Sequence, residues 1–547
     1  MPADSTTLLS TNEAPDYGAV HEANRGATAI QDADGTQIEY PGPLKMVPIS
    51  IVMGLAIFIL GLDNTIVGTA TPTITNEFHS LTGIGWYGSA YRVATCSTQF
   101  FYGKLYEQFR VKWVFVVSVL ILELGSVVCA SAPTSTAFIV GRAVAGCGAS
   151  GIVTGVFIAI SYTVPLHLRP IYNSTVGALE CVAMIIAPVV GGVLTTYASW
   201  RWCFWLNLPI GGFTIVVIIL LFENPKNQTI SECSIASKLD QLNIPNLLIF
   251  TASVVCLLMA LEWGGTTYSW SSGRIIALLV VSGSLLATFV GLEAVQKARA
   301  TVPTSVILKK TAGLCVLYAF CASAAFNVVD YFLPIWFQAI KGASAAGSGQ
   351  MLLPSIISLC IAAFSSGFIV AGIGYYTPHM LLGSTLMGVG FGFLTTLTPS
   401  SGPAAWVGWQ LLLGLGMGLA IPQPWSAIQT ALPAGQVPLG MTAVSFAISI
   451  GAALSTSVSQ NVFTNKLRRG LHDVPGLIDV DSLIRQGATE LLKRIPDSER
   501  SHVLEIYNFA LTSTFWVCVA VVALGMVAAL CMDWNSVKSD KAAPDSE

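Results

Sequence analysis

Fourteen apolar segments, each about 20 residues long or longer, dominate this chain of 547 residues. A helix of that length crosses the roughly 30 Å of hydrocarbon in a bilayer, and it satisfies its own backbone hydrogen bonds where water is absent. The sequence therefore predicts an all-α integral membrane protein with fourteen transmembrane helices. The expected spans are 47–70, 84–104, 112–131, 135–160, 172–195, 202–222, 244–263, 273–295, 312–335, 348–371, 378–398, 404–428, 437–459 and 507–532.

The composition excludes several classes of protein. Only 10% of the residues are charged and 53% are hydrophobic, whereas roughly 25% charged residues are usual in a soluble domain. The net charge of −3, without a basic tract, argues against nucleic-acid binding. The chain has no phosphate-binding loop for ATP, no H-E-x-x-H or G-x-S-x-G motif and no Cys/His ligand cluster. We therefore expect no enzyme activity, no use of ATP, no metal and no cofactor.

Lysine and arginine residues are divided unevenly between the two sets of loops. Fourteen of them fall on the side of the termini and three on the other side, when the long loop 460–506 is set aside. Because short cytoplasmic loops retain lysine and arginine, both termini are predicted to be cytoplasmic. The loop 460–506 has seven basic residues and is expected outside, since its length approaches that at which this rule loses force.

A weak internal repeat relates the fourth and twelfth segments. Arg142-x-x-x-Gly146-x-Gly148 aligns with Gln410-x-x-x-Gly414-x-Gly416, as in transporters built from two related bundles with a substrate site between them. The sequence predicts two pseudo-symmetric six-helix bundles with two extra helices between them. The expected parts are a disordered cytoplasmic N-tail (1–46), an N-terminal bundle (47–222), a linker with the two extra helices (223–311), a C-terminal bundle that includes the extracellular loop 460–506 (312–532) and a cytoplasmic C-tail (533–547).

Four ionisable residues inside the expected spans are candidates for proton coupling. A carboxylate in a membrane span costs about 2.5–3.5 kcal/mol, so Asp63 needs a partner or a role. A carboxyl group whose surroundings alternate can load and release a proton; the alternative is an aspartate that caps a helix end. Arg142 cannot deprotonate and can tune Asp63 or Glu180, or it is satisfied by backbone carbonyls for packing alone. Arg92 is expected to be a further buried cation.

Two glycine-containing stretches are candidates for a conformational gate. Gly177–Gly192 includes Glu180 and combines small residues with a proline, which predicts a bent and closely packed helix; a bend in an inert helix is the alternative. The loop after the second segment places charges at the ends of adjacent helices, where ion pairs can lock one conformation or simply anchor the loop inside. The gate candidates are Gly103, Glu107, Arg110, Lys112, Pro188, Gly191 and Gly192.

Polar and aromatic residues elsewhere in the expected spans are candidates for lining a substrate cavity. Asp330 and Asn327 are one helical turn apart and therefore share a face. Aromatic side chains can line an apolar cavity, although many serve as core or interface residues instead. The cavity candidates are Tyr91, Asn327, Asp330, Tyr331, Gln410 and Trp425.

Four motifs in order give the chain a family resemblance. Leu62–Pro72, Gly103–Lys112, Gly141–Ala149 and Gly177–Gly192 resemble the motifs of the major facilitator superfamily, in its fourteen-helix drug:proton antiporter branch. The run Trp200–Gly212 is similar to the start of the family's sixth helix, and the whole is most like fungal multidrug and mycotoxin efflux pumps. The resemblance implies that Asp63 and Arg142 take part in coupling export to inward proton flow.

The chain departs from the family motifs at four positions. Glu107 and Arg110 stand where the loop motif usually has aspartate and glycine, which puts the locking geometry in doubt. Ala145 replaces the usual glutamine of the fourth helix, and Ala187 replaces a glycine of the fifth. The coupling arginine and the proline of the fifth helix remain.

Together these features predict a secondary active exporter of a hydrophobic or amphipathic small molecule, such as a toxin, secondary metabolite or drug, in exchange for protons. The expected location is the plasma membrane, with the vacuolar membrane as the alternative. Within transporters, the alternative is a fourteen-helix carrier for siderophores or vacuolar basic amino acids. From another class, a sensor without transport is possible, but the short N-tail argues against it.

Overall fold

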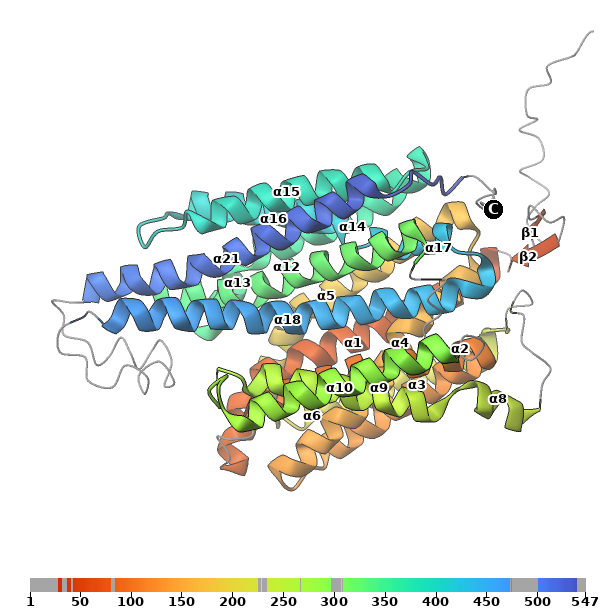
Figure 1. Cartoon of the computed structure of the whole chain (residues 1–547), viewed down its shortest axis with the longest axis horizontal. Helices are drawn as coiled ribbons and strands as arrows, with labels where there is room; N and C mark the ends of the chain where they lie inside the picture. The colour runs from red at the N-terminus through yellow and green to blue at the C-terminus, as the bar shows by residue number, and fades with distance from the viewer. Residues whose placement is uncertain are drawn as a thin grey trace, which may run out of the picture.

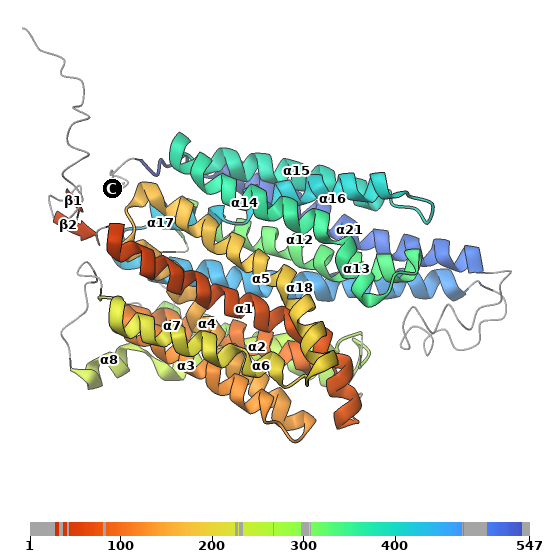
Figure 2. The same cartoon turned by 180° about the vertical axis from the view of Figure 1, so that it is seen from behind.

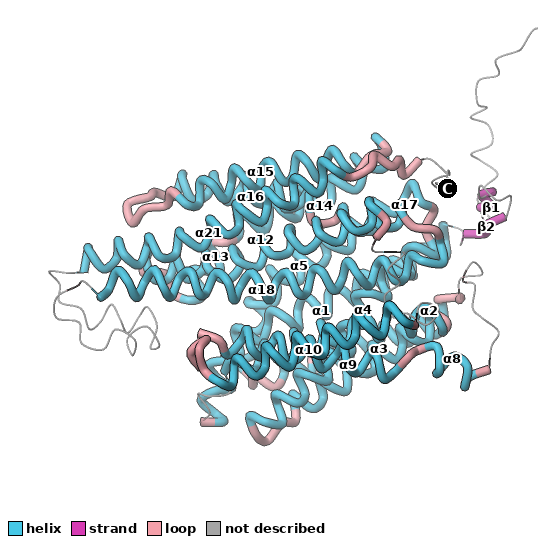
Figure 3. Tube along the Cα trace, in the orientation of Figure 1, coloured by secondary structure: helices cyan, strands magenta, loops and turns pink. Residues whose placement is uncertain are grey.

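The computed structural model describes residues 28–31, 37–40, 43–79, 84–224, 228, 234–265, 267–296, 306, 308–472, 474 and 500–538. These residues are almost entirely helical (Figure 3). The strands β1 (Thr28–Gln31) and β2 (Gln37–Tyr40) form an antiparallel hairpin. The hairpin lies within the tail 1–46, for which the sequence predicts no regular structure, so the tail is not uniformly irregular.

A helix, or a pair of consecutive helices, occupies each of the fourteen predicted spans. The helices are α1 (Pro43–Phe78), α2 (Ile84–Gln108), α3 (Val111–Ala130), α4 (Ser135–Thr163), α5 (Arg169–Tyr197), α6 (Trp202–Trp205), α7 (Asn207–Leu221), α9 (Ile244–Trp263), α10 (Gly273–Val295), α12 (Lys310–Lys341), α13 (Ala345–Met351), α14 (Leu353–Ile373), α15 (Thr377–Thr395), α16 (Pro403–Ala420), α17 (Gln423–Ala431), α18 (Val437–His472) and α21 (Arg500–Cys531). The short helix α8 (Ile235–Gln241) lies in the linker. Prolines mark two of the breaks, Pro354 after α13 and Pro422 after α16, because proline removes a helical hydrogen-bond donor.

Twelve helices of the described chain are long and apolar enough to cross a membrane. The predicted spans outside this group are α2 and α15. α2 contains Arg92, Lys104 and Glu107, which lower its mean hydropathy, and α15 contains His379. Both helices pack within the bundles, α2 against α4 and α15 against α16, so the fold remains consistent with fourteen spans.

The largest differences in helix boundaries concern the predicted loop 460–506. α18 continues as a helix to His472, and α21 begins at Arg500. The loop is therefore shorter than predicted, because the polar residues after 460 extend a helix beyond its apolar part. The rest of this loop lies outside the described residues, apart from Val474.

The helices form two groups that meet along a boundary (Figures 1 and 2). α1–α4, α6 and α7 lie on one side of the boundary, and α12–α17 and α21 lie on the other. α5 packs against both α1 and α14, while α18 packs against both α12 and α2. The extra helices α9 and α10 pair with each other, and α9 also contacts α2 and α18. α1 begins and α21 ends at the same end of the molecule, which we call the terminal end (Figure 1).

The internal repeat has a structural counterpart. A Cβ atom on Gly146 would overlap the backbone of α2, and one on Gly148 would overlap the backbone of α3. In the second bundle, a Cβ atom on Gly414 would overlap α14, and one on Gly416 would overlap α15. Each glycine pair therefore lets one central helix approach two neighbours closely, as small residues do in membrane bundles. This equivalence supports the two pseudo-symmetric bundles predicted from the sequence.

Candidate functional site

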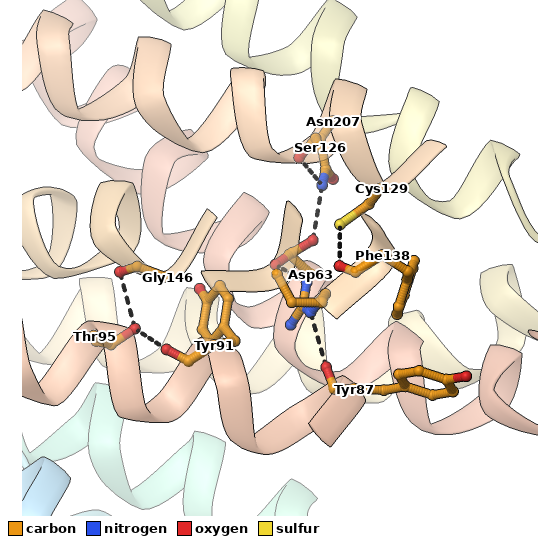
Figure 4. A network of polar contacts seen from close by, with 10 residues as sticks. Asp63, Tyr87, Tyr91, Thr95, Ser126, Cys129, Phe138, Gly146 and Asn207 are labelled. Carbon is orange, nitrogen blue, oxygen red and sulfur yellow. Dashed lines mark hydrogen bonds and ion pairs between the residues drawn. The ribbon is translucent and has the colours of Figure 1, made fainter. Parts of the chain in front are cut away.

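Asp63 and Arg142 form an ion pair in the interior of the first bundle. Asp63 on α1 is 0% exposed and Arg142 on α4 is 1% exposed, and Arg142 Nη1 donates to Asp63 Oδ2 over 2.7 Å. Arg142 Nε also donates to the carbonyl oxygen of Tyr87 on α2 over 3.1 Å (Figure 4). The pair joins α1, α2 and α4. Asp63 lies well inside α1, so it does not cap a helix end.

The second oxygen of Asp63 is bound from the opposite side. Asn207, the first residue of α7, donates through Nδ2 to Asp63 Oδ1 and to Ser126 Oγ on α3, both over 3.1 Å (Figure 4). The Arg142 guanidinium also lies 4.4 Å from the centre of the Tyr91 ring, close enough for a cation–π interaction. Tyr91, predicted to line a substrate cavity, is 6% exposed and covers the ion pair in this conformation.

In this arrangement, the contacts of Asp63 depend on whether its carboxyl group carries a proton. A buried charge is tolerated when it is paired and its remaining lone pairs are satisfied, and Asp63 meets both conditions. Protonation of Asp63 cancels its attraction to Arg142, which stays charged because a guanidinium does not deprotonate. A proton on Asp63 therefore weakens contacts that hold together α1, α4 and α7.

The other two coupling candidates lie outside this pair. Glu180 on α5 is exposed, and α1 packs close to it at Gly61, where a Cβ atom would lie 3.0 Å from the Glu180 carbonyl oxygen. Arg92 on α2 was expected to be buried, but it is exposed, and it interacts electrostatically with Asp330 on α12. Arg92 and Asp330 therefore lie near each other across the boundary between the bundles.

The remaining polar cavity candidates differ in their surroundings. Asn327 is half-buried and donates to the carbonyl oxygen of Ser323 on its own helix over 3.0 Å. Tyr331 is 49% exposed. Gln410 is 0% exposed, and its side-chain atoms have no hydrogen-bond partner among the described residues. Gln410 is therefore enclosed within the second bundle in this conformation, at the position that Arg142 has in the first.

The gate candidates on α5 contribute unequally to helix packing. Gly191 is buried, and a Cβ atom there would overlap Thr69 and Ile66 on α1. A Cβ atom on Gly192 would meet nothing within 4 Å. Pro188 lies inside α5 and is exposed. Close approach of α1 and α5 therefore depends on Gly191 and not on Gly192.

The charged gate candidates make their contacts within the first bundle. Lys104 Nζ contacts Glu107 Oε2 over 2.9 Å within α2, rather than bridging the bundles as a lock would require. Lys112 Nζ donates to the carbonyl oxygen of Ile219 on α7 over 2.8 Å, and Arg110 is the exposed N-cap of α3. Gly103 alone reaches the other bundle, since a Cβ atom there would overlap Thr442 on α18.

The two bundles meet near the terminal end through contacts that we call the seam, formed by Phe157, Asn173, Trp425, Ser426 and Gln429. The rings of Phe157 on α4 and Trp425 on α17 stack with centroids 3.7 Å apart and an angle of 7°. Asn173 on α5 donates to Ser426 Oγ over 3.2 Å and to Gln429 Oε1 over 3.3 Å. Trp425 was predicted to line a cavity, but it is 5% exposed and closes the seam here.

The described residues contain no group of three or more His, Cys, Asp or Glu side chains that could hold a metal ion. The polar groups of the interior instead bind one another, as the Asp63 network shows. This network offers proton binding and the making and breaking of internal contacts.

Comparison with known proteins identifies the family. The sequence profile of the Major Facilitator Superfamily matches residues 53–456. The chain belongs to this superfamily. It is 41% identical over 501 residues to "MFS-type efflux pump MFS1" of Arthroderma benhamiae, covering 92% of this chain and 94% of that protein. It is 40% identical over 549 residues to "Aspyridones efflux protein" of Neocamarosporium betae, covering 99% and 97%.

Solved structures share the fold at low sequence identity. The proton:xylose symporter XylE matches with a TM-score of 0.59 and 13% identity, covering 89% of this chain and 95% of that chain. The human organic anion transporter MFSD10 matches with a TM-score of 0.58 and 11% identity, covering 88% and 100%. The predicted resemblance to the superfamily and to fungal efflux pumps is confirmed, and the chain is a multi-pass membrane transporter rather than an enzyme.

Several residues of the site were not predicted. Asn207 lies in the run Trp200–Gly212, which was used only as a family motif. Phe157 and Asn173 carried no charge that would single them out in an apolar segment. A polar residue at the start of a membrane helix is a usable signal for Asn207, whereas the stacking of Phe157 depends on the second bundle.

Proposed function

We propose that this transporter exports a hydrophobic or amphipathic small molecule in exchange for protons. The observation that carries the proposal is the fully buried Asp63–Arg142 pair, a protonatable charge at the junction of three helices. The relatives named as efflux pumps support the direction of transport and the kind of substrate. By the basic-residue bias, the terminal end faces the cytoplasm, and the plasma membrane is the proposed location.

In the proposed cycle, the contacts of the seam open and close as the bundles move. In alternating access, one bundle rocks against the other around a central site. The Phe157–Trp425 stack and the Asn173 hydrogen bonds hold the terminal end closed here, so they must separate to admit a substrate from that side. Proton binding at Asp63 loosens the helices of the first bundle and makes the relative energies of the two states depend on protonation.

The driving force is large enough for this cycle without ATP. One charge moving through 100 mV yields about 2.3 kcal/mol, and one pH unit adds about 1.4 kcal/mol per proton. Breaking a buried ion pair by removing one partner costs about 3–5 kcal/mol. The free energy released when one proton moves down this gradient is thus of the same order as the cost of breaking the contact between Asp63 and Arg142.

A transport assay with purified protein in liposomes tests this proposal. Ethidium and neutral fluorescent drugs serve as probes, with a pH gradient imposed in either direction. The proposal predicts accumulation of a probe on the acidic side of the membrane, abolished by a protonophore. Movement of probe together with protons contradicts the exporter and favours a carrier of the siderophore or basic amino-acid kind.

A further inference from the structure

Glu123 on α3 is a buried carboxyl group for which the site described above has no role. It is 9% exposed, and both of its side-chain oxygens lack a hydrogen-bond partner among the described residues. Its Oε1 atom lies against Gly211 on α7, and a Cβ atom on that glycine would overlap the carboxyl group. Gly211 therefore makes the space that Glu123 fills.

Glu123 lies one helical turn from the Asp63 network along α3, and Gly211, which Glu123 contacts, lies one turn from the same network along α7. On α3 it stands three residues before Ser126, and on α7 Gly211 stands four residues after Asn207. Residues at these spacings are neighbours on one helix face. Ser126 and Asn207 are bonded to each other, and Asn207 binds Asp63. Glu123 and Asp63 are close enough to interact electrostatically.

The charges around Glu123 decide its protonation. α7 contains no ionisable residue, and α6 contributes only Cys203. α4 contributes Arg142, whose guanidinium is bound to Asp63, together with Cys147 and Tyr162. The ionisable residues of α2 are Tyr87, Tyr91, Arg92, Cys96, Tyr102, Lys104, Tyr106 and Glu107, of which Lys104 and Glu107 pair with each other. An ionised carboxylate without a partner costs several kcal/mol in a dry interior. Glu123 is therefore neutral while Asp63 is ionised, and one proton keeps the three groups Asp63, Arg142 and Glu123 electrically neutral.

We propose that Glu123 is a second proton-binding residue, so that the coupling unit is the pair Asp63–Glu123. This inference rests on the proposed proton coupling. The proton leaves the Glu123 carboxyl and the Asp63 carboxylate gains it, so Glu123 becomes the carboxylate and the buried net charge stays zero. Two carboxyl groups that interact in this way titrate as a pair. Arg142, released by Asp63, favours the ionised form of Glu123.

Infrared spectroscopy of the full-length protein in phospholipid nanodiscs tests proton binding without any substrate. Wild type should show a protonated-carboxyl band at neutral pH that Glu123→Gln lacks and Glu123→Asp keeps. As the pH rises, this band disappears when Glu123 ionises. In Asp63→Asn it should disappear at a lower pH, because the negative charge of Asp63, which opposes ionisation of Glu123, is gone. A band unchanged in Glu123→Gln, or a titration unmoved in Asp63→Asn, overturns the inference. The Asp63→Asn result decides even if Glu123→Gln does not fold.

Ethidium transport into proteoliposomes then tests coupling. Because the proposed coupling unit contains Glu123, Glu123→Gln should move the half-maximal pH of transport by about one unit, the scale at which interacting carboxyl groups titrate as a pair. Glu505→Gln, at an exposed position on α21, is the matched control and should leave it unmoved. An unmoved Glu123→Gln profile refutes the coupling role alone. Absence of gradient-driven transport in wild type refutes the proposed antiport instead, while the infrared result still decides proton binding.

Discussion

Replacing Phe157 by leucine should open the terminal end of the transporter more often. Leucine keeps most of the apolar volume but removes the ring that stacks on Trp425 at 3.7 Å. An aromatic pair is worth about 0.5–1.5 kcal/mol beyond its buried area. Because this pair joins the two bundles, its loss destabilises only the closed seam. At 1.4 kcal/mol per factor of ten, the opening equilibrium should rise about 2- to 12-fold.

Maleimide labelling of a cysteine placed in the boundary measures this equilibrium. Ser174 on α5 is 2% exposed and lies 3.4 Å from Ser366 on α14, Oγ to Oγ, so Ser174→Cys reacts only when the boundary opens. The variant is made in a protein whose native cysteines are replaced. When opening and closing are fast, the labelling rate is proportional to the open fraction and should rise by the same factor in Phe157→Leu.

A matched core substitution separates opening of the seam from general loosening. Phe391 on α15 is 0% exposed and belongs to the second bundle, so Phe391→Leu should lower the thermal stability without a comparable rise in labelling. Equal labelling in Phe157→Leu and the parent protein refutes the view that the stack holds the seam closed. An equal rise in both leucine variants refutes it as well.

Two further perturbations test other parts of the structure. Thr311 Oγ1 and Lys310 Nζ donate to Asp533 over 2.7 and 2.9 Å and hold the pKa of Asp533 below its ordinary value of 3.8. The resulting stabilisation is present above about pH 4 and is lost as the pH falls through the lowered pKa. The protection of residues 532–538 against hydrogen exchange, relative to the intrinsic rate at each pH, should therefore fall under acid, and Asp533→Asn should remove that dependence. The thiols of Cys181 on α5 and Cys360 on α14 lie close together across the bundle boundary. An oxidant that joins them in a disulfide should stop transport until the bond is reduced. Continued transport by protein that mass spectrometry shows to be cross-linked contradicts rocking at this boundary.

The sequence was sufficient to predict the helices, because an apolar run about 20 residues long has few other stable forms in a membrane. The sequence was less informative where a helix continues beyond its apolar residues or contains charged ones. α18 continues through polar residues to His472, so hydropathy alone ended it too early. α2 is placed by its packing against α4 and α9 in spite of its charges.

The candidate site was predictable in part for a related reason. Asp63 and Arg142 stand out because charges are costly in a membrane, and the structure joins these two in an ion pair of which Glu180 is not a member. Their neighbour Asn207 could not be placed, because its contact with Asp63 depends on how α7 packs against α1 and α3. The contact between Asn173 and Ser426 joins residues 253 positions apart, and no local pattern indicates it.

The most direct test of the central claim is to record proton movement and transport together. Liposomes that contain a pH-sensitive dye and purified transporter are loaded with ethidium, and both fluorescence signals are followed after a pH gradient is imposed. We expect wild type and Asp63→Glu to move protons against ethidium. Asp63→Asn, confirmed as folded by its elution as a monodisperse species, should move neither in response to the gradient. Proton-coupled exchange that persists in Asp63→Asn would contradict the assignment of Asp63 as the coupling residue.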